Sequence, residues 1–225
     1  MPILSSFGTL RRTTVQTRQN YSANFNDASY CSFSAGSLSP GSGAFSVEFF
    51  LNMTAIPAAG TEDVILDFGY STFVRGLRIV FDEFSKVVAE ISTSSNIYIL
   101  SNATTVSAGV WVYVAVSRVS GGSTRLFVNT TQSNVPNITA SLSFTSNRFG
   151  TGVNTMTTNF LNGRIASLRY NIGSGFSTAT IPTAPLTATA QTKILTFQTP
   201  TLINEIGGAA PSTNTGVTVS QTGPF

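Results

Sequence analysis

The sequence contains no histidine and a single cysteine, Cys31. A serine or cysteine nucleophile needs a positioned base, usually histidine, so the familiar catalytic triads have no candidate here. Zinc sites are built mainly from histidine and cysteine clusters, and a lone cysteine cannot form a disulfide within the chain. We therefore expect Cys31 to be a small buried side chain in an aromatic-rich strand.

Charge is also scarce, because only 9% of the 225 residues are charged, against roughly 25% in an ordinary soluble domain. Such a surface gives little protection against self-association. No apolar run approaches the roughly 18 residues of a membrane helix, so we expect no membrane insertion. The first residues, MPILSSFGTLRR, place their charges after a short apolar stretch. This order is the reverse of a secretory signal, which we do not expect.

Uncharged polar residues and phenylalanine take the place of charge. The chain holds 61 serines and threonines, 16 asparagines and 17 phenylalanines, and 41% of its residues are hydrophobic. A disordered chain has the opposite composition, with high charge and few aromatics. This length and composition predict one large domain with a substantial core.

The net charge of +3 is concentrated near the N-terminus. Arg11, Arg12 and Arg18 precede the first acid, Asp27, and the rest of the chain carries nine basic and nine acidic side chains. Residues 1–19 lack periodicity, and we interpret them as a basic arm that is either a solvated tail or a partner-docking segment. Three arginines are too few to indicate nucleic-acid binding.

Short apolar alternations recur about every ten residues, which is typical of strands. The clearest has five apolar residues at period 2: Phe45, Val47, Phe49, Leu51 and Met53. We expect strands within residues 21–34, 44–54, 63–69, 77–92, 97–101, 111–129, 138–144 and 160–170. No helical periodicity and no internal repeat is present, so the pattern predicts an all-β antiparallel sandwich.

Two phrases carry a family resemblance. Residues 111–129 read WVYVAVSRVSGGSTRLFVN, a hairpin turning at Gly121-Gly122, and residues 160–170 read FLNGRIASLRY, entered through Asn162-Gly163. In this order they resemble the closing strands of the concanavalin A-like jelly roll, in its laminin-G-like branch common in structural proteins of tailed phages. The resemblance covers about residues 20–206 and implies a domain that binds or builds without catalysing.

The C-terminal part of the chain begins with a segment rich in proline and threonine. By itself it looks like a linker, but Thr192 to Thr196 resemble a Thr-Lys-Leu-Leu-Thr strand of the same branch. The ending GVTVSQTGPF predicts one last strand. We therefore expect residues 20–172 to form the jelly-roll sandwich and residues 173–225 to add a loop and C-terminal strands that pack on it or on a neighbour.

The nine carboxylates do not form the pattern of a glycoside hydrolase, which needs two acids about 5–10 Å apart across the sugar bond. The chain has no Glu-X-Asp-X-X-Glu phrase. Glu62 and Asp63 are adjacent and would point to opposite faces, and Asp82 and Glu83 occupy an expected turn. Hydrolysis therefore stays a remote alternative.

Calcium is the one metal that the resemblance suggests. Its candidate ligands are Asp27, Asp63 and Asp67, because calcium prefers carboxylate and carbonyl oxygens. The branch commonly has Ile-Asp-Glu in its closing strand, where this chain has Ile165, Ala166 and Ser167, without either acid. We expect no cofactor, with calcium as the minor alternative.

Sugar binding would need an exposed aromatic ring beside amide or hydroxyl groups. Candidate contacts on expected loops are Tyr70, Phe73, Phe149, Phe176, Asn154 and Asn159. Each ring is also compatible with a place in the core or in an interface. The working surface would be formed by the rim loops 55–62, 70–76 and 147–159. Trp111, on an expected central strand, is assigned to the core.

Three functions remain open. The first is a non-enzymatic virion protein of a tailed phage, a head decoration, knob or short appendage subunit that docks on capsid or tail proteins through its terminal segments. The second is a carbohydrate-binding domain of a tail fibre or appendage that recognises a cell-surface glycan. The third, an adhesion or secreted lectin-like module, is disfavoured by the absence of paired cysteines. Low-charge edges favour a homo-oligomer, which we expect to be a trimer.

Overall fold

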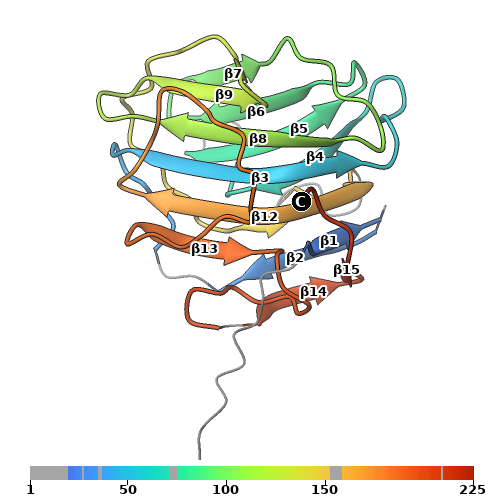
Figure 1. Cartoon of the computed structure of the whole chain (residues 1–225). Helices are drawn as coiled ribbons and strands as arrows, with labels where there is room; N and C mark the ends of the chain where they lie inside the picture. Colours follow the sequence, from blue (N-terminus) through green and yellow to red (C-terminus); the bar gives the residue numbers. More distant parts are fainter. Residues whose placement is uncertain (1–19, 27, 35–36, 71–74, 153–158, 209) are drawn as a thin grey trace, which may run out of the picture.

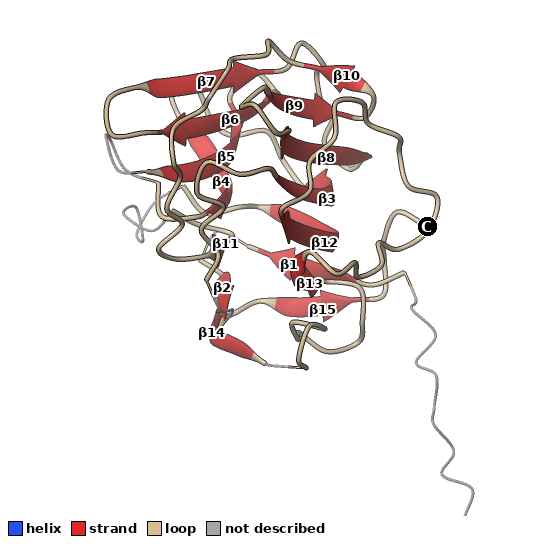
Figure 2. Ribbon diagram, turned by 90° about the vertical axis from the view of Figure 1, so that its left-hand side faces the viewer, coloured by secondary structure: helices blue, strands red, loops and turns tan. Residues whose placement is uncertain are grey.

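A computed structural model describes residues 20–26, 28–34, 37–70, 75–152, 159–208 and 210–225 (Figure 1). Arg11, Arg12, Arg18 and Asp27 therefore lie outside the described residues, as do Phe73 and Asn154. The described part is a sandwich of two sheets stacked face to face (Figure 2), in which every pair of named strands is antiparallel. The predicted all-β sandwich is confirmed.

The first sheet has eight strands in the order β10-β9-β8-β3-β12-β1-β15, with β13 also paired to β12. Their bounds are β1 (Ser22–Phe25), β3 (Phe45–Met53), β8 (Trp111–Arg118), β9 (Thr124–Val128), β10 (Thr131–Gln132), β12 (Gly163–Ile172), β13 (Thr192–Thr196) and β15 (Thr218–Ser220). Strands from both ends of the chain therefore flank β12, so the C-terminal part is built into the sandwich.

The second sheet has seven strands in the order β14-β2-β11-β4-β5-β6-β7. Their bounds are β2 (Tyr30–Phe33), β4 (Glu62–Asp67), β5 (Gly76–Asp82), β6 (Val87–Ser92), β7 (Ile97–Ser101), β11 (Arg148–Phe149) and β14 (Pro211–Thr215). The chain crosses between the sheets repeatedly, so each sheet is assembled from segments distant in sequence.

The core lies between the sheets and follows from the alternation along each strand. On β3, Phe45, Val47, Phe49, Leu51 and Met53 are all fully buried, because successive side chains of a strand point to opposite faces. Rings from loops and strands pack edge-on beside them, as Phe45 and Phe144 do at a centroid distance of 5.8 Å. The single cysteine, Cys31, is also buried.

Two expectations about the fold need correction. Residues 138–144 are not a strand but an extended loop with one bridge, between Gly41 and Leu142. Their alternation arises because Ile138, Leu142 and Phe144 point into the core, which requires extended backbone but no neighbouring strand. Trp111 is only half-buried and packs outside the main core, in a cluster on the outer face of the first sheet.

That outer face is covered by the chain itself. Its apolar side chains Phe50, Tyr113, Ala115, Phe127 and Ala166 are each at most 5% exposed. Residues 173–191, here called the crossing segment, connect the end of β12 to the start of β13. On the way they run over the outer face of β3 and β8 (Figure 1). The C-terminal residue adds Phe225, whose ring meets Phe50 at 5.0 Å. These five side chains are therefore buried and cannot contact a ligand in this structure.

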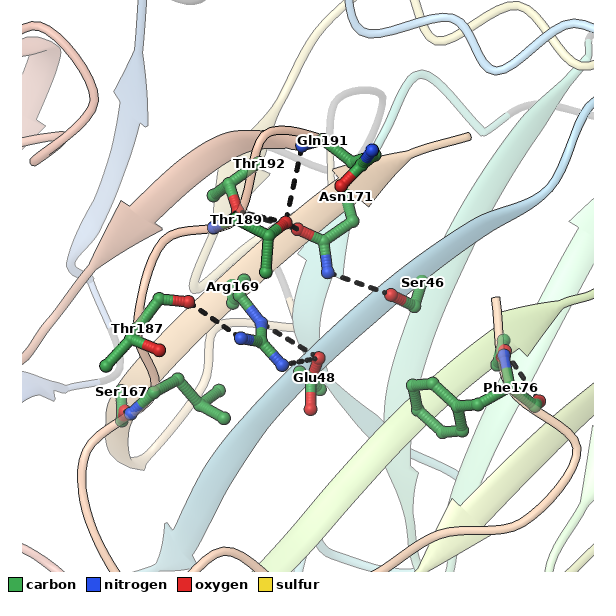
Figure 3. Close-up of polar contacts among 12 residues, drawn as sticks. Ser46, Glu48, Ser167, Arg169, Asn171, Phe176, Thr187, Thr189, Gln191 and Thr192 are labelled. Carbon is green, nitrogen blue, oxygen red and sulfur yellow. Dashed lines mark hydrogen bonds and ion pairs between the residues drawn. The ribbon is translucent and has the colours of Figure 1, made fainter. Parts of the chain in front are cut away.

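Polar contacts hold the crossing segment on the sheet (Figure 3). The Arg169 guanidinium bridges the Glu48 carboxylate, at 2.8 Å, and the Thr187 carbonyl, at 2.7 Å. The Ser167 hydroxyl accepts the Leu186 N–H at 2.7 Å. Strand side chains thus satisfy backbone groups of a segment that has no ladder of its own, as buried backbone groups require.

Two buried tyrosines predict sensitivity to alkali. Burial raises the pKa of Tyr113, whose hydroxyl donates to Glu48, and of Tyr170, whose hydroxyl donates to the Leu38 carbonyl. A folded-state pKa above the unfolded value of about 10 means that the folded state retains protons which the unfolded chain releases, so stability falls above about pH 10. Urea titrations at pH 8 and pH 11 should show this fall, reduced in Tyr170→Phe. Equal stability at both values would refute it.

Candidate functional site

The apolar cluster on the outer face of the first sheet is covered, whereas the rim carries an open groove. The best groove at the rim, here called the Phe84 groove, has a volume of about 340 Å3. It is lined by Gly60, Thr61, Glu62, Asp82, Glu83, Phe84 and Asn159. The loop before β4, the β5–β6 turn and the residue before Phe160 meet there, although they are far apart in the sequence.

The β5–β6 turn projects an aromatic ring into solvent. The Asp82 carboxylate accepts the N–H groups of Phe84, at 3.0 Å, and Lys86, at 2.8 Å, which is the local bonding that makes aspartate a turn former. Ser85 takes a positive φ of 61° to close the turn. As a result Phe84 is 68% exposed, the highest value among the exposed large hydrophobic residues described.

The loop on the other side of the groove is tied to this turn. The Glu83 carboxylate accepts the Gly60 N–H, and the Thr61 hydroxyl donates to the Ala58 carbonyl at 2.6 Å. Gly60 has a φ of 77°, in the left-handed region that suits glycine. The side chain of Glu83 therefore bridges the two walls of the groove.

The groove is acidic. Glu62, Asp82 and Glu83 line it, and none of the lining residues is basic. Burial raises the pKa of Glu62, against the opposing effect of Arg78, which pairs with it at 2.8 Å. Carboxylate and amide oxygens accept hydrogen bonds from hydroxyl groups, so this lining with its exposed ring suits a neutral, hydroxyl-rich ligand.

The expected glycan contacts are only partly brought together. Asn159 lies in the Phe84 groove and has a φ of 62°. Tyr70 does not line it: its ring packs over the Arg78 guanidinium at 4.9 Å on the second sheet. Arg78 in turn pairs with Glu62, which lines the groove.

Phe149 is not a ligand contact, which corrects the expectation. Its ring is fully buried between the sheets and packs edge-on against Phe197 at 5.5 Å and Phe33 at 6.0 Å. The two-residue strand β11 places it opposite Cys31 and Leu66, so that it points inward. Phe176 packs against Phe127 at 5.7 Å in the cover of the first sheet.

The two described calcium candidates bond to the backbone instead. One Asp63 oxygen accepts the Asn162 N–H at 3.1 Å, and one Asp67 oxygen accepts the Tyr70 N–H at 2.7 Å. Among the described residues, no three histidine, cysteine, aspartate or glutamate side chains are grouped as metal ligands. Calcium usually needs six to eight oxygens, so the described residues do not fit the ion.

The sequence analysis placed Asp82 and Glu83 in a turn but did not assign the turn a function. The available signal was an aromatic residue, Phe84, that follows two acids at the tip of a turn.

In the part of the chain that the structure describes, no helix is long and apolar enough to cross a membrane.

Comparisons with known proteins describe the same fold. The family model described as the concanavalin A-like lectin/glucanases superfamily matches residues 25–171. A putative carbohydrate-binding protein of Bacteroides ovatus is similar in structure, with a TM-score of 0.64 and 11% identity over 91% of this chain and 60% of that one. The chain thus spans less than two thirds of this relative. A search of curated proteins gives no match.

Two further solved structures share the sandwich. The LG4-5 domains of the mouse laminin alpha1 chain have a TM-score of 0.53 at 11% identity, covering 73% of this chain and 47% of that one. The enzymatically active domain of tailspike protein 2 of bacteriophage CBA120 has a TM-score of 0.51 at 12% identity, covering 68% and 25%. Identities this low show a common fold alone.

Proposed function

Since the chain belongs to the concanavalin A-like lectin/glucanase superfamily, we propose that it recognises a neutral carbohydrate through the Phe84 groove and does not cleave it. The observation that carries this proposal is the solvent-exposed ring of Phe84 beside three carboxylates and an amide. An aromatic face offers the apolar C–H groups of a sugar a surface to stack on, and the oxygens accept its hydroxyls.

The carboxylates support binding more than hydrolysis. A glycosidase needs one carboxylic acid to protonate the leaving oxygen and a second carboxylate across the bond. Although burial raises the pKa of Glu62, its side chain is paired with Arg78. Asp82 holds the turn through two N–H groups. Both acids therefore have structural partners that a catalytic pair would have to give up.

Phe84→Ala should weaken glycan binding at least about tenfold, or roughly 1.4 kcal/mol. The variant should fold normally, because an exposed side chain contributes little to stability. A glycan array would identify the ligand, and calorimetry with the best hit would give the affinities. Ile99→Ala is the control, since Ile99 is 58% exposed on β7 and lies outside the groove.

Two results would contradict the proposal. An array of neutral glycans without a hit, repeated with soluble oligosaccharides at millimolar concentration, would remove its basis. Release of reducing sugar during the titration, abolished in Glu62→Gln, would replace recognition by hydrolysis.

We further propose that this module belongs to a tailed-phage virion, as a homo-oligomeric decoration or appendage subunit. The resemblance of Thr192 to Thr196 to a strand of the phage branch supports it, as does a surface with few charges. Mass spectrometry and immunogold microscopy of purified particles test the placement. Regular labelling over the head would favour decoration, labelling at the tail would favour receptor recognition, and unlabelled particles would contradict both. Light scattering tests the trimer.

A further inference from the structure

A second groove, with a volume of about 520 Å3, lies beside the end of β2. Six serines line it: Ser32, Ser34, Ser37, Ser39, Ser146 and Ser212. It is here called the serine groove. It shares no lining residue with the Phe84 groove, so what it binds is independent of the function proposed above.

The walls of the serine groove are fixed by side chains that replace a strand ladder. The Asn147 amide accepts the Phe33 N–H at 2.8 Å and donates to the Phe33 carbonyl at 2.7 Å. Across the groove, the Ser39 hydroxyl accepts the Phe144 N–H at 3.0 Å. The Tyr170 hydroxyl donates a hydrogen bond to the Leu38 carbonyl at 2.6 Å. The concavity is therefore preformed by bonds to the core.

The charge of the groove is opposite to that of the Phe84 groove. Arg148 is its one charged lining residue. The guanidinium stacks over the Tyr30 ring at 5.1 Å and donates only a long hydrogen bond, of 3.4 Å, to the Gly152 carbonyl. Within the described residues no carboxylate forms an ion pair with it. Most of its five donors are therefore unused.

One acid does face Arg148. Asp67 is its register partner across β11 and β4. That carboxylate is 2% exposed and accepts the Tyr70 N–H. The other residues that line the groove are uncharged.

Serine hydroxyl groups line the same groove as Arg148. The Ser146 Oγ is buried and has no hydrogen-bond partner, although a buried polar atom normally has one. Ser34, Ser37 and Ser212 are exposed at the mouth of the groove. Ser146 and Arg148 both line the groove. Because the Ser146 Oγ is itself buried, it has to change rotamer before a ligand with several acceptor oxygens can accept hydrogen bonds from both groups.

We infer that the serine groove binds an oxyanion, a carboxylate, sulfate or phosphate group, held by the Arg148 guanidinium and the Ser146 hydroxyl. A planar guanidinium donates two parallel hydrogen bonds to such a group, which gives direction as well as attraction. The surrounding hydroxyls accommodate further polar atoms of the ligand, so the anionic group of an acidic saccharide and a free inorganic anion are both sources of this chemistry.

The test is a titration of the full chain with glucuronate, glucose and inorganic sulfate, followed by the amide NMR signals of Ser146 and Arg148. Glucuronate should shift these signals at millimolar concentration or below, and glucose should not. Sulfate that competes with glucuronate would identify a general oxyanion site, whereas glucuronate binding that resists sulfate would identify an acidic-sugar site. Both outcomes support the proposal.

Variants separate the site from the fold. Arg148→Gln should lower the affinity at least tenfold, and Arg148→Lys should retain part of it because the charge remains while the fork is lost. Arg164→Gln is the matched control, since Arg164 is also half-buried and, within the described part of the chain, donates one long hydrogen bond, of 3.5 Å, to Asn24. Ser212→Phe should block the groove from its exposed mouth. Phe84→Ala should bind the anion normally.

The absence of shifts with both anions at tens of millimolar would overturn the proposal. So would equal shifts with glucose, or an affinity that Arg148→Gln leaves unchanged in a folded protein.

Discussion

Replacing Arg118 by methionine is expected to destabilise the protein by about 3 kcal/mol or more. Arg118 is fully buried at the end of β8. Its guanidinium donates to the carbonyls of Gly43 at 2.9 Å, Gly41 at 2.6 Å and Ala140 at 3.1 Å. Methionine would fill similar space but leave these carbonyls without their donors, and each unsatisfied buried group costs roughly 1–3 kcal/mol.

Burial lowers the pKa of the Arg118 guanidinium, and its other neighbour is the Phe45 ring at 5.1 Å. The buried guanidinium of Arg118 thus links β8 to the loop after β2 and to residues 138–144 through its hydrogen bonds to backbone carbonyls. Urea unfolding would measure the loss, with Arg164→Met as the control that should change stability by less than about 1 kcal/mol. An unfolding midpoint equal to the wild type would show that the loops hold without the arginine.

Gly175→Val is expected to lift the crossing segment from the first sheet. A Cβ atom at position 175 would stand 2.1 Å from the Arg118 carbonyl oxygen and 3.2 Å from that of Phe45. Both neighbours are backbone atoms of central strands and cannot rotate away. The start of the segment must therefore move, and the ring of Phe176, which packs on Phe127, moves with it.

The expected result is partial rather than global unfolding. The apolar face under the segment would be exposed, so binding of a hydrophobic dye should rise, and stability should fall by roughly 1–3 kcal/mol, as overpacking does. Ser174→Val is the matched control, because Ser174 is an exposed neighbour in the same segment. Unchanged dye binding in Gly175→Val would mean that the close approach relaxes locally.

This cover bears directly on function. The crossing segment and Phe225 cover the cluster of Phe50, Tyr113 and Phe127, so these side chains do not contact a ligand. The Phe84 groove at the rim and the serine groove beside the end of β2 carry opposite charge. If Gly175→Val exposes the covered face without changing glycan affinity, recognition resides at the rim; a coupled loss would place part of it on the first sheet.

The strands were predictable where one side of an extended segment is buried. Period-2 alternation marked β3, the β5–β6 hairpin and the β8–β9 hairpin, because a core requires apolar residues on every second position. The same signal misled at 138–144, where Leu142 is buried but a loop carries it. The alternation did not predict β10 and β14, because these strands lie at the sheet edges and their side chains are mostly exposed.

The grooves were less predictable, because each is a meeting of distant segments. Asn159 and the loop 55–62 were expected at one rim, and the Phe84 groove does unite them. Phe149 was expected on a rim loop, where Gly150 and Gly152 follow it, yet β11 turns it inward between β2 and β4. A neighbouring glycine indicates that the chain turns, but it does not indicate whether the aromatic side chain points into the core or into solvent.

The sequence by itself determined the all-β class, the turn positions and the lack of the residues for histidine-based catalysis, since these depend on composition and on local periodicity. The tertiary structure decided which aromatic rings are exposed, that a C-terminal segment covers one sheet, and that acids gather in one groove while Arg148 and serines gather in another. Those outcomes depend on strand order and crossing loops, which are set by packing between residues more than a hundred positions apart and leave no mark on any short stretch of sequence.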